Sequence, residues 1–152
     1  MVSIPRLRVF VVNDYLLEKL ESVNQEVDSL LSTSPLIIRK YMQHLITSKG
    51  KGIRALSVLT TALNEEGEVS DDSIIMAASL EILHLATLVH DDVMDDADTR
   101  RGVDTLHKKY GRKTAVICGD YLLALAMHTV AKVKIDDQSA LKYTDILMGL
   151  VL

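Results

Sequence analysis

The sequence is poor in the residues that most often build disulfide-bonded or β-rich domains. Its 152 residues include no Trp, one Phe, two Pro and a single cysteine, Cys118. One cysteine cannot form an internal disulfide, and its apolar surroundings are typical of a protein from the reducing cytoplasm. The scarcity of aromatic residues beside 48% hydrophobic content favours a core of packed helices over a sandwich of strands.

The sequence also lacks an excess of positive charge. Lys and Arg total 17 against 21 Asp and Glu, which gives a formal net charge of −4. Nucleic-acid-binding domains need a basic surface, so we predict no nucleic-acid partner. No uninterrupted apolar stretch approaches the roughly 18 residues of a membrane span, and Arg6 and Arg8 interrupt the apolar start, unlike in a signal peptide. We therefore expect a soluble, cytoplasmic protein.

Hydrophobic periodicity and capping residues predict helices along most of the chain. The expected helices cover residues 14–31, 35–48, 53–64, 71–94, 106–110, 113–133 and 140–152, with a polar loop at 95–105 and no pair of strands. The helix at 71–94 is apolar on most sides, so we expect it to be central and buried. The predicted fold class is all-α, with residues 1–152 as a single helical domain and 1–12 as an irregular N-terminal segment. Because the last apolar run ends without a capping signal, we expect the chain to be the front part of a longer protein.

An acidic cluster closes the central helix. Asp91 and Asp95 are spaced i, i+4, and Asp92 and Asp95 are spaced i, i+3, so the carboxylates share one face. Oxygen ligands without cysteine or a fixed histidine pair favour Mg²⁺ over zinc or copper. Arg100 and Arg101 follow, and guanidinium groups match phosphate oxygens with paired hydrogen bonds. The pattern predicts a metal-dependent diphosphate site, against the plain alternative of a solvated acidic helix end beside a basic loop.

A second basic segment lies near residue 50. Lys51 and Arg54 flank a glycine-rich join, where the N–H groups of a helix start add positive potential. The segment is a candidate phosphate-binding site, and a solvated basic loop would explain the same residues equally well. His84 lies seven residues before Asp91, two turns away on the same face, and is either a hydrogen-bonded core residue or a donor to a phosphate oxygen.

The neighbours His90 and Asp91 allow a different interpretation. A His-Asp dyad is typical of helical metal-dependent phosphohydrolases, which add distant His and Asp ligands. That hypothesis leaves Asp92, Asp95 and the two arginines that follow them without a role.

Four ordered motifs resemble the trans-polyprenyl diphosphate synthases. They are Gly50-Lys51 with Arg54, the run from Glu81 to Asp95, Arg100-Arg101-Gly102, and the run Gly-Asp-Tyr-Leu-Leu at 119–123. The resemblance covers roughly residues 15–152. It implies an all-α fold, the N-terminal half of the isoprenoid synthase helical bundle.

The resemblance also implies a function, that of a prenyltransferase that condenses isopentenyl diphosphate with an allylic diphosphate of the farnesyl or geranyl type. Asp91, Asp92 and Asp95 would bind the allylic diphosphate through Mg²⁺, with Arg100 on the same group. The diphosphate of isopentenyl diphosphate would be held by Lys51, Arg54, His84 and Arg101. A homodimer is usual for the family, a heterodimer is the alternative, and the apolar product would pass to a membrane.

The sequence departs from the family pattern in two ways. The basic join of the family commonly reads Gly-Lys-Arg-Leu-Arg-Pro, and here Gly52 and Ala55 replace an Arg and the Pro. The second Asp-rich motif of the family has no counterpart in the chain, because Asp136 and Asp137 lack a third Asp at the right spacing. We therefore expect the isolated chain to be inactive, and the alternative is a non-catalytic fragment or one subunit of a heteromeric prenyl synthase.

Small residues before the Asp-rich motif predict the length of the product. Ala86 and Thr87 stand where short-chain members of the family place aromatic residues, and Leu83 or Ile82, one turn deeper, are candidates for the floor of a tunnel. The resemblance therefore implies a medium- to long-chain product, such as hexaprenyl, heptaprenyl or octaprenyl diphosphate.

Overall fold

The computed structural model describes residues 14–47 and 50–133, and over these ranges the predicted all-α fold is confirmed. The described elements, in chain order, are α1 (Asp14–Ser32), α2 (Leu36–Ile46), α3 (Ile53–Thr61), α4 (Asp71–Met94), β1 (Thr99–Arg100), β2 (Val103–Asp104), α5 (Leu106–Tyr110) and α6 (Arg112–Val130). Each helix begins and ends within a few residues of its prediction. The predicted segments at 1–12 and 140–152 lie outside the described residues.

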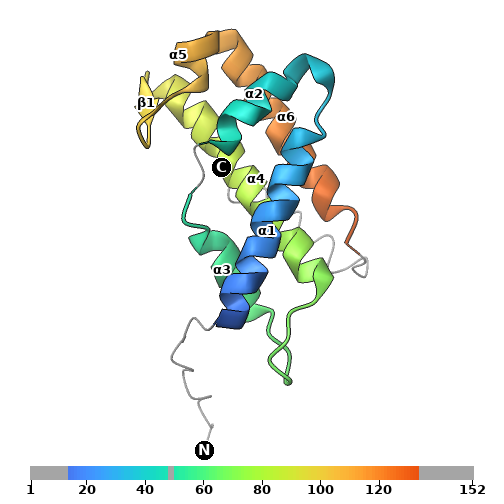
Figure 1. Ribbon diagram of the computed structural model, residues 1–152. Helices are drawn as coiled ribbons and strands as arrows, with labels where there is room; N and C mark the ends of the chain where they lie inside the picture. The colour runs from blue at the N-terminus through green and yellow to red at the C-terminus, as the bar shows by residue number, and fades with distance from the viewer. Residues whose placement is uncertain (1–13, 48–49, 134–152) are drawn as a thin grey trace, which may run out of the picture.

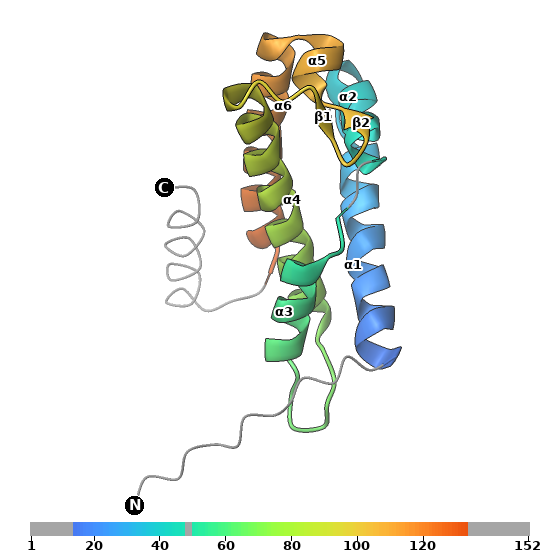
Figure 2. The ribbon, with the colours of Figure 1, turned by 90° about the vertical axis from the view of Figure 1, so that its left-hand side faces the viewer.

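Helix α4 is the central element of the bundle, as its apolar sequence predicts. Its N-terminus is capped by Ser70, whose side chain accepts a hydrogen bond from the N–H of Ser73 at 3.2 Å. Helix α6 packs along α4 over the most extensive contact in the fold, while α1 and α3 also pack on α4. Helices α2 and α5 lie near the end of the bundle where α4 ends, and α3 lies toward the other end (Figures 1 and 2).

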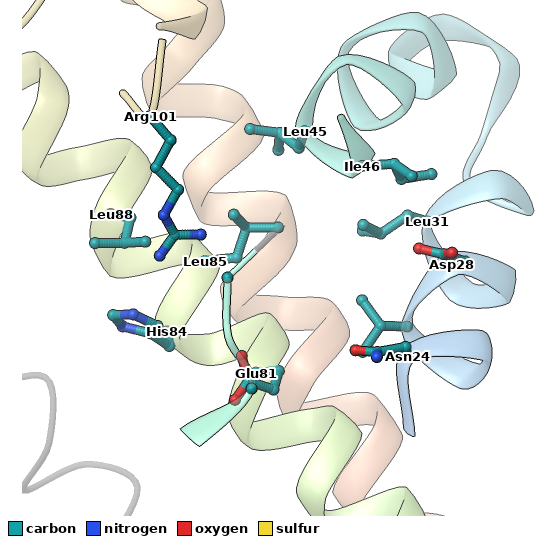
Figure 3. A pocket seen from close by; sticks show the side chains of 13 residues that line it. Asn24, Asp28, Leu31, Leu45, Ile46, Glu81, His84, Leu85, Leu88 and Arg101 are labelled. Atoms are coloured by element: carbon teal, nitrogen blue, oxygen red, sulfur yellow. The ribbon is translucent and has the colours of Figure 1, made fainter. Parts of the chain in front are cut away.

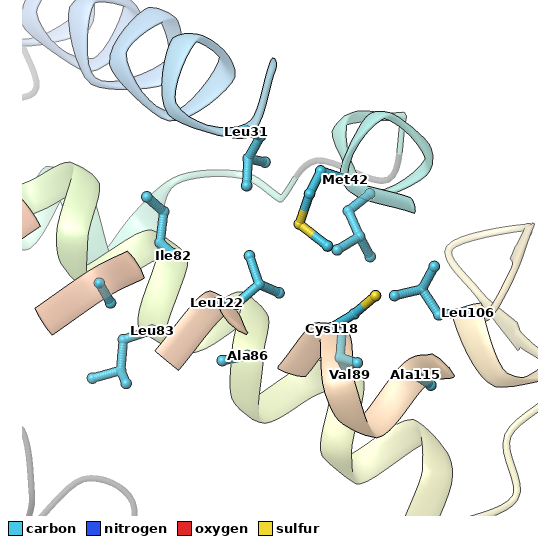
Figure 4. Packing of buried hydrophobic residues seen from close by; sticks show 12 residues of the cluster. Leu31, Met42, Ile82, Leu83, Ala86, Val89, Leu106, Ala115, Cys118 and Leu122 are labelled. Carbon is cyan, nitrogen blue, oxygen red and sulfur yellow. The ribbon is translucent and has the colours of Figure 1, made fainter. Parts of the chain in front are cut away.

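Two apolar clusters hold the helices together. The first joins α1, α2, α4, α5 and α6 near the C-terminal half of α4 and includes Leu31, Met42 and Leu122 (Figure 4). The second joins α1, α3 and α4, with Val23 and Leu59 fully buried. Fully buried apolar side chains of this size contribute about 1.5–3 kcal/mol each relative to an exposed position. The packing therefore fixes the position of α4 from several sides.

Helix α4 has the length and composition of a helix that could cross a membrane, which the sequence prediction missed. The prediction considered only uninterrupted apolar runs, whereas an 18-residue window of α4 reaches a mean hydropathy of 1.6 with few charges. The core helix of a compact bundle has the same composition. Because α4 packs against α1, α3 and α6, that second explanation accounts for its apolar sequence.

The predicted loop at 95–105 contains a short antiparallel hairpin, so the prediction of no strand pair is wrong. Thr99 of β1 pairs with Asp104 of β2, and Arg100 pairs with Val103. The two loop residues, Arg101 and Gly102, have φ angles of 51° and 79°. Positive φ at both positions matches the two-residue hairpin turns whose twist suits paired strands. Arginine rarely adopts this conformation, so only the glycine signalled the turn in the sequence.

Candidate functional site

The four basic residues predicted to hold a diphosphate line one pocket. Lys51 and Arg54 come from the turn before α3 and its first residues, His84 from the middle of α4, and Arg101 from the loop of the hairpin. Three segments that are distant in sequence thus bring three cationic side chains and one imidazole together. We call this set of four residues the basic pocket.

Glycines allow the turn before α3 to lie close to its neighbours. A Cβ atom on Gly50 would stand 2.9 Å from Nη1 of Arg101, and one on Gly52 would stand 2.8 Å from Cδ1 of Leu20 in α1. Gly52 also has a φ of 64°, a left-handed conformation that glycine adopts without strain. The turn is therefore packed between the hairpin loop on one side and α1 on the other.

Glu81 belongs to the same pocket, and the sequence analysis did not count it as a site residue. Its Oε1 accepts a hydrogen bond of 3.0 Å from the backbone N–H of Ala55 in the first turn of α3. It lies one turn before His84 on α4, so the two side chains project from the same face. A carboxylate on an otherwise apolar helix was the signal that could have identified it.

The imidazole of His84 is tuned by burial and by its charged neighbours. Burial lowers its pKa below 6.5, and the positive charge of Arg54 lowers it further, while Glu81 acts in the opposite direction. Near neutral pH the ring is therefore mainly uncharged. A neutral imidazole still offers one N–H to an acceptor such as a phosphate oxygen.

A largely apolar pocket extends from the basic pocket toward α1 and α2 (Figure 3). His84 and Arg101 line both spaces, and Leu85 and Leu88 of α4 add apolar side chains to the second one. The polar side chains that α1 contributes to this pocket are Asn24 and Asp28. The site thus combines a cationic opening with apolar walls.

The three aspartates at the end of α4 stand in different environments. Asp91 and Asp95 are exposed, whereas Asp92 is only 6% exposed and binds the guanidinium of Arg100. That hydrogen-bonded carboxylate raises the pKa of Arg100. Asp92 and Arg100 therefore contact each other in this structure, and their predicted roles toward a metal and a diphosphate stay predictions.

The donor atoms at this helix end suit a hard cation. Asp91 and Asp95 lie one turn apart, and within 14–47 and 50–133 no hydrogen bond or ion pair engages their carboxylates. Over the same ranges, no three His, Cys, Asp or Glu side chains stand close enough together to hold a metal ion. Two exposed carboxylates fit a Mg²⁺ ion that completes its shell with water and phosphate oxygens.

The chain turns back sharply after α4 at Asp96. This residue has a φ of 55°, and the next N–H, that of Ala97, donates to the carbonyl of Asp92 at 3.0 Å. Arg112 of α6 donates to the carbonyl of Val93 at 3.0 Å and to Oδ1 of Asp96 at 3.1 Å. These bonds satisfy carbonyls at the helix end and direct the hairpin back along α4.

His90 faces α6 and takes no part in a metal cluster among the described residues. Its Nε2 lies 3.3 Å from Oδ1 of Asp120 and 3.4 Å from the carbonyl of Val116. The ring also lies so close to Gly119 that a Cβ atom there would overlap it. The contact explains part of the Gly-Asp motif at 119–120 as helix packing, and it offers no support for the phosphohydrolase hypothesis.

The residues predicted to set product length are packed inside the bundle. Ile82, Leu83 and Ala86 are buried in the first apolar cluster, as Figure 4 shows. Thr87 is half-buried, and its hydroxyl donates to the carbonyl of His84 at 2.8 Å. Their role as walls or floor of a tunnel stays a prediction.

Comparison with known proteins identifies the family. Residues 35–151 match the sequence model of the Polyprenyl synthetase family. The geranylgeranyl diphosphate synthase of Sulfolobus acidocaldarius is 37% identical over 120 residues, which cover 79% of this chain and 36% of that protein. Heptaprenyl diphosphate synthase component 2 of Bacillus subtilis is 29% identical over 119 residues, 78% of this chain and 34% of the relative.

A solved structure supports the same assignment. The crystal structure of heptaprenyl diphosphate synthase from Staphylococcus aureus superposes with a TM-score of 0.77 at 30% identity, covering 86% of this chain and 41% of that one. The chain thus spans about a third of the length of the curated relatives it matches. Family model, sequence identity and superposed helices agree, and the chain belongs to the polyprenyl synthetase family.

Proposed function

We propose that this chain forms the diphosphate-binding part of a prenyltransferase that joins isopentenyl diphosphate to an allylic diphosphate. The observation that carries the proposal is the basic pocket, in which Lys51, Arg54, His84 and Arg101 converge from three segments. Up to three positive charges and one imidazole N–H match the charge and the acceptor oxygens of a diphosphate. The apolar pocket beside it suits a hydrocarbon chain.

The end of α4 is the proposed site for the allylic diphosphate. Asp91 and Asp95, with Asp92 if Arg100 releases it, would hold Mg²⁺, and the ion would neutralise charge on the diphosphate. Arg100 lies on the first strand of the hairpin, so a diphosphate between the helix end and the hairpin would meet Mg²⁺ on one side and this guanidinium on the other.

The proposed reaction explains why the site needs charge more than a nucleophile. The bond between the allylic carbon and the diphosphate oxygen breaks, the isopentenyl double bond attacks the resulting carbocation, and a proton is lost. The barrier lies in separating the negative diphosphate from carbon, so fixed positive groups provide most of the stabilisation. The rest comes from holding the two substrates in line.

A condensation assay tests this function. The chain would be incubated with farnesyl diphosphate, radiolabelled isopentenyl diphosphate and Mg²⁺, and products would be extracted into organic solvent. Extended polyprenyl product would establish a complete activity in the 152-residue chain. Release of inorganic phosphate from a nucleotide monoester would instead favour the phosphohydrolase hypothesis.

A second function has support of its own. One relative is named component 2 of a heptaprenyl diphosphate synthase, and the chain spans about a third of that relative's length. We infer that the chain could act as a subunit or fragment that binds diphosphate and completes its activity only with another polypeptide. Binding of diphosphate without condensation would favour this alternative. A homodimer, a cytoplasmic location and the product length stay predictions.

A further inference from the structure

Helix α3, which carries Arg54, begins without a capping side chain of its own. Its N-cap residue is Gly52, and no side chain at that position can accept a hydrogen bond from the first turn. Helix starts leave several backbone N–H groups without helical partners, and those groups favour a negative neighbour. The first turn of α3 thus needs an acceptor from elsewhere in the fold.

Glu81 of α4 provides that acceptor. Its Oε1 binds the N–H of Ala55 at 3.0 Å, and Ala55 is itself fully buried. A proline at this position would have no N–H to donate, whereas alanine has one. The bond is therefore available because this chain carries Ala55.

We propose that Glu81 is a positioning residue, which caps α3 and so holds Lys51 and Arg54 against His84 and Arg101. The proposal rests on the proposed function, since it assigns the pocket to a diphosphate. The turn is already packed against Leu20 and Arg101, and the bond from Glu81 fixes it from the third side, that of α4. Glu81 does this at an electrostatic cost, because its negative charge opposes an anion in the same pocket.

Because the negative charge of Glu81 disfavours a bound anion, a positioning role and a purely electrostatic role predict opposite effects of removing the side chain. If Glu81 acted only through its charge, removing the charge would tighten anion binding in every variant. If Glu81 positions the turn, Glu81→Gln should bind at least as tightly as the wild type, because its amide oxygen still accepts from Ala55. Glu81→Ala should bind more weakly although it also removes the negative charge. Glu and Ala have similar helix propensities, so α4 itself should be little affected.

The experiment is a calorimetric titration of the full 152-residue chain with inorganic pyrophosphate in the presence of Mg²⁺. Glu65→Gln, an exposed change in the loop before α4, is the matched control. We expect Glu81→Ala to weaken binding about five- to tenfold, as loss of a helix cap and its hydrogen bond would produce. Glu81→Gln and the control should stay within about twofold or bind more tightly. Equal or tighter binding by a folded Glu81→Ala chain would overturn the proposal.

Hydrogen exchange at the Ala55 amide gives a readout that needs no ligand. Exchange of the Ala55 amide should accelerate in Glu81→Ala and stay slow in Glu81→Gln. Equal protection of this amide in both variants would overturn the proposal that Glu81 caps α3. Absence of pyrophosphate binding by the wild type would count against the proposed function instead, and the exchange result would still decide the role of Glu81.

Discussion

The guanidinium of Arg100 binds the carboxylate of Asp92 through three hydrogen bonds, from Nε at 2.9 and 3.1 Å and from Nη2 at 2.7 Å. Asp92 ends the buried face of α4, and Arg100 ends the first strand of the hairpin. The pair therefore fastens the hairpin to the helix end that carries the acidic motif. It also keeps the charge of a buried carboxylate compensated.

Removing Arg100 should destabilise the protein. In Arg100→Gln the buried carboxylate of Asp92 loses its charged partner, and we expect the free energy of unfolding to fall by about 1–3 kcal/mol, since the arginine is partly exposed. Urea unfolding followed by circular dichroism measures the change. Lys132→Gln, which removes an exposed positive charge after α6, is the control. Equal unfolding curves for the two variants would contradict a structural role for the pair.

The packing of His90 on Gly119 predicts that Gly119→Ala destabilises the wild-type protein but stabilises a protein that carries His90→Ala. Gly119→Ala places a Cβ in the space that the imidazole fills, so it should destabilise the wild type by about 1–3 kcal/mol. In a His90→Ala background the space is free, and the same change should stabilise α6 by up to about 1 kcal/mol, because Ala favours helix over Gly. Thermal unfolding of the four proteins checks this. An equal loss of stability from Gly119→Ala in the wild type and in His90→Ala would mean that the contact with His90 is not the reason for glycine at position 119.

The lowered pKa of His84 predicts how stability depends on pH. Above pH 6.5 the imidazole is neutral in the folded and unfolded chains, so its environment carries no penalty. As the pH falls below 6.5, the unfolded chain binds a proton before the folded chain does, and the free energy of unfolding decreases until the folded pKa is reached. Denaturation of the wild type and of His84→Gln between about pH 8 and pH 5 should show that the free energy of unfolding falls more steeply with decreasing pH in the wild type. Parallel curves would be inconsistent with the burial of the ring beside Arg54.

Ala86 offers a test of product length in any preparation that condenses the two diphosphates. Ala86→Phe should shorten the product, because a phenyl ring would block the predicted tunnel below the acidic motif. The residue is 2% exposed in the first apolar cluster, so the change should also cost about 1–3 kcal/mol through overpacking. Ala78→Phe, at a fully buried position in the other cluster, controls for that cost. Unchanged product length in a folded Ala86→Phe protein would contradict the prediction that Ala86 lines the tunnel.

Helices and their caps were predictable because they depend on local signals. Ser70 before two aspartates predicted the start of α4, and the apolar residues of α4 predicted a buried helix. The hairpin was missed because its turn depends on an arginine at positive φ, a conformation that the local preference of arginine disfavours.

The members of the basic pocket were predictable, but their partners were not. The motifs of a family identified Lys51, Arg54, His84 and Arg101 without giving any distance between them. The contacts of Glu81 with Ala55 and of Asp92 with Arg100 join residues on different elements, and no periodicity in the sequence specifies such pairs. Only the packing of α3 and the hairpin on α4 brings them together.

The affinity of the chain for isopentenyl diphosphate, measured by calorimetry with Mg²⁺, tests whether the basic pocket binds a diphosphate. We expect saturable binding, weakened about tenfold by Arg54→Gln through loss of a charge-assisted contact in the basic pocket. Lys132→Gln, which removes a charge outside this pocket, should bind like the wild type. No saturable binding, or equal affinity in the wild type and Arg54→Gln, would contradict the assignment of the basic pocket to a diphosphate.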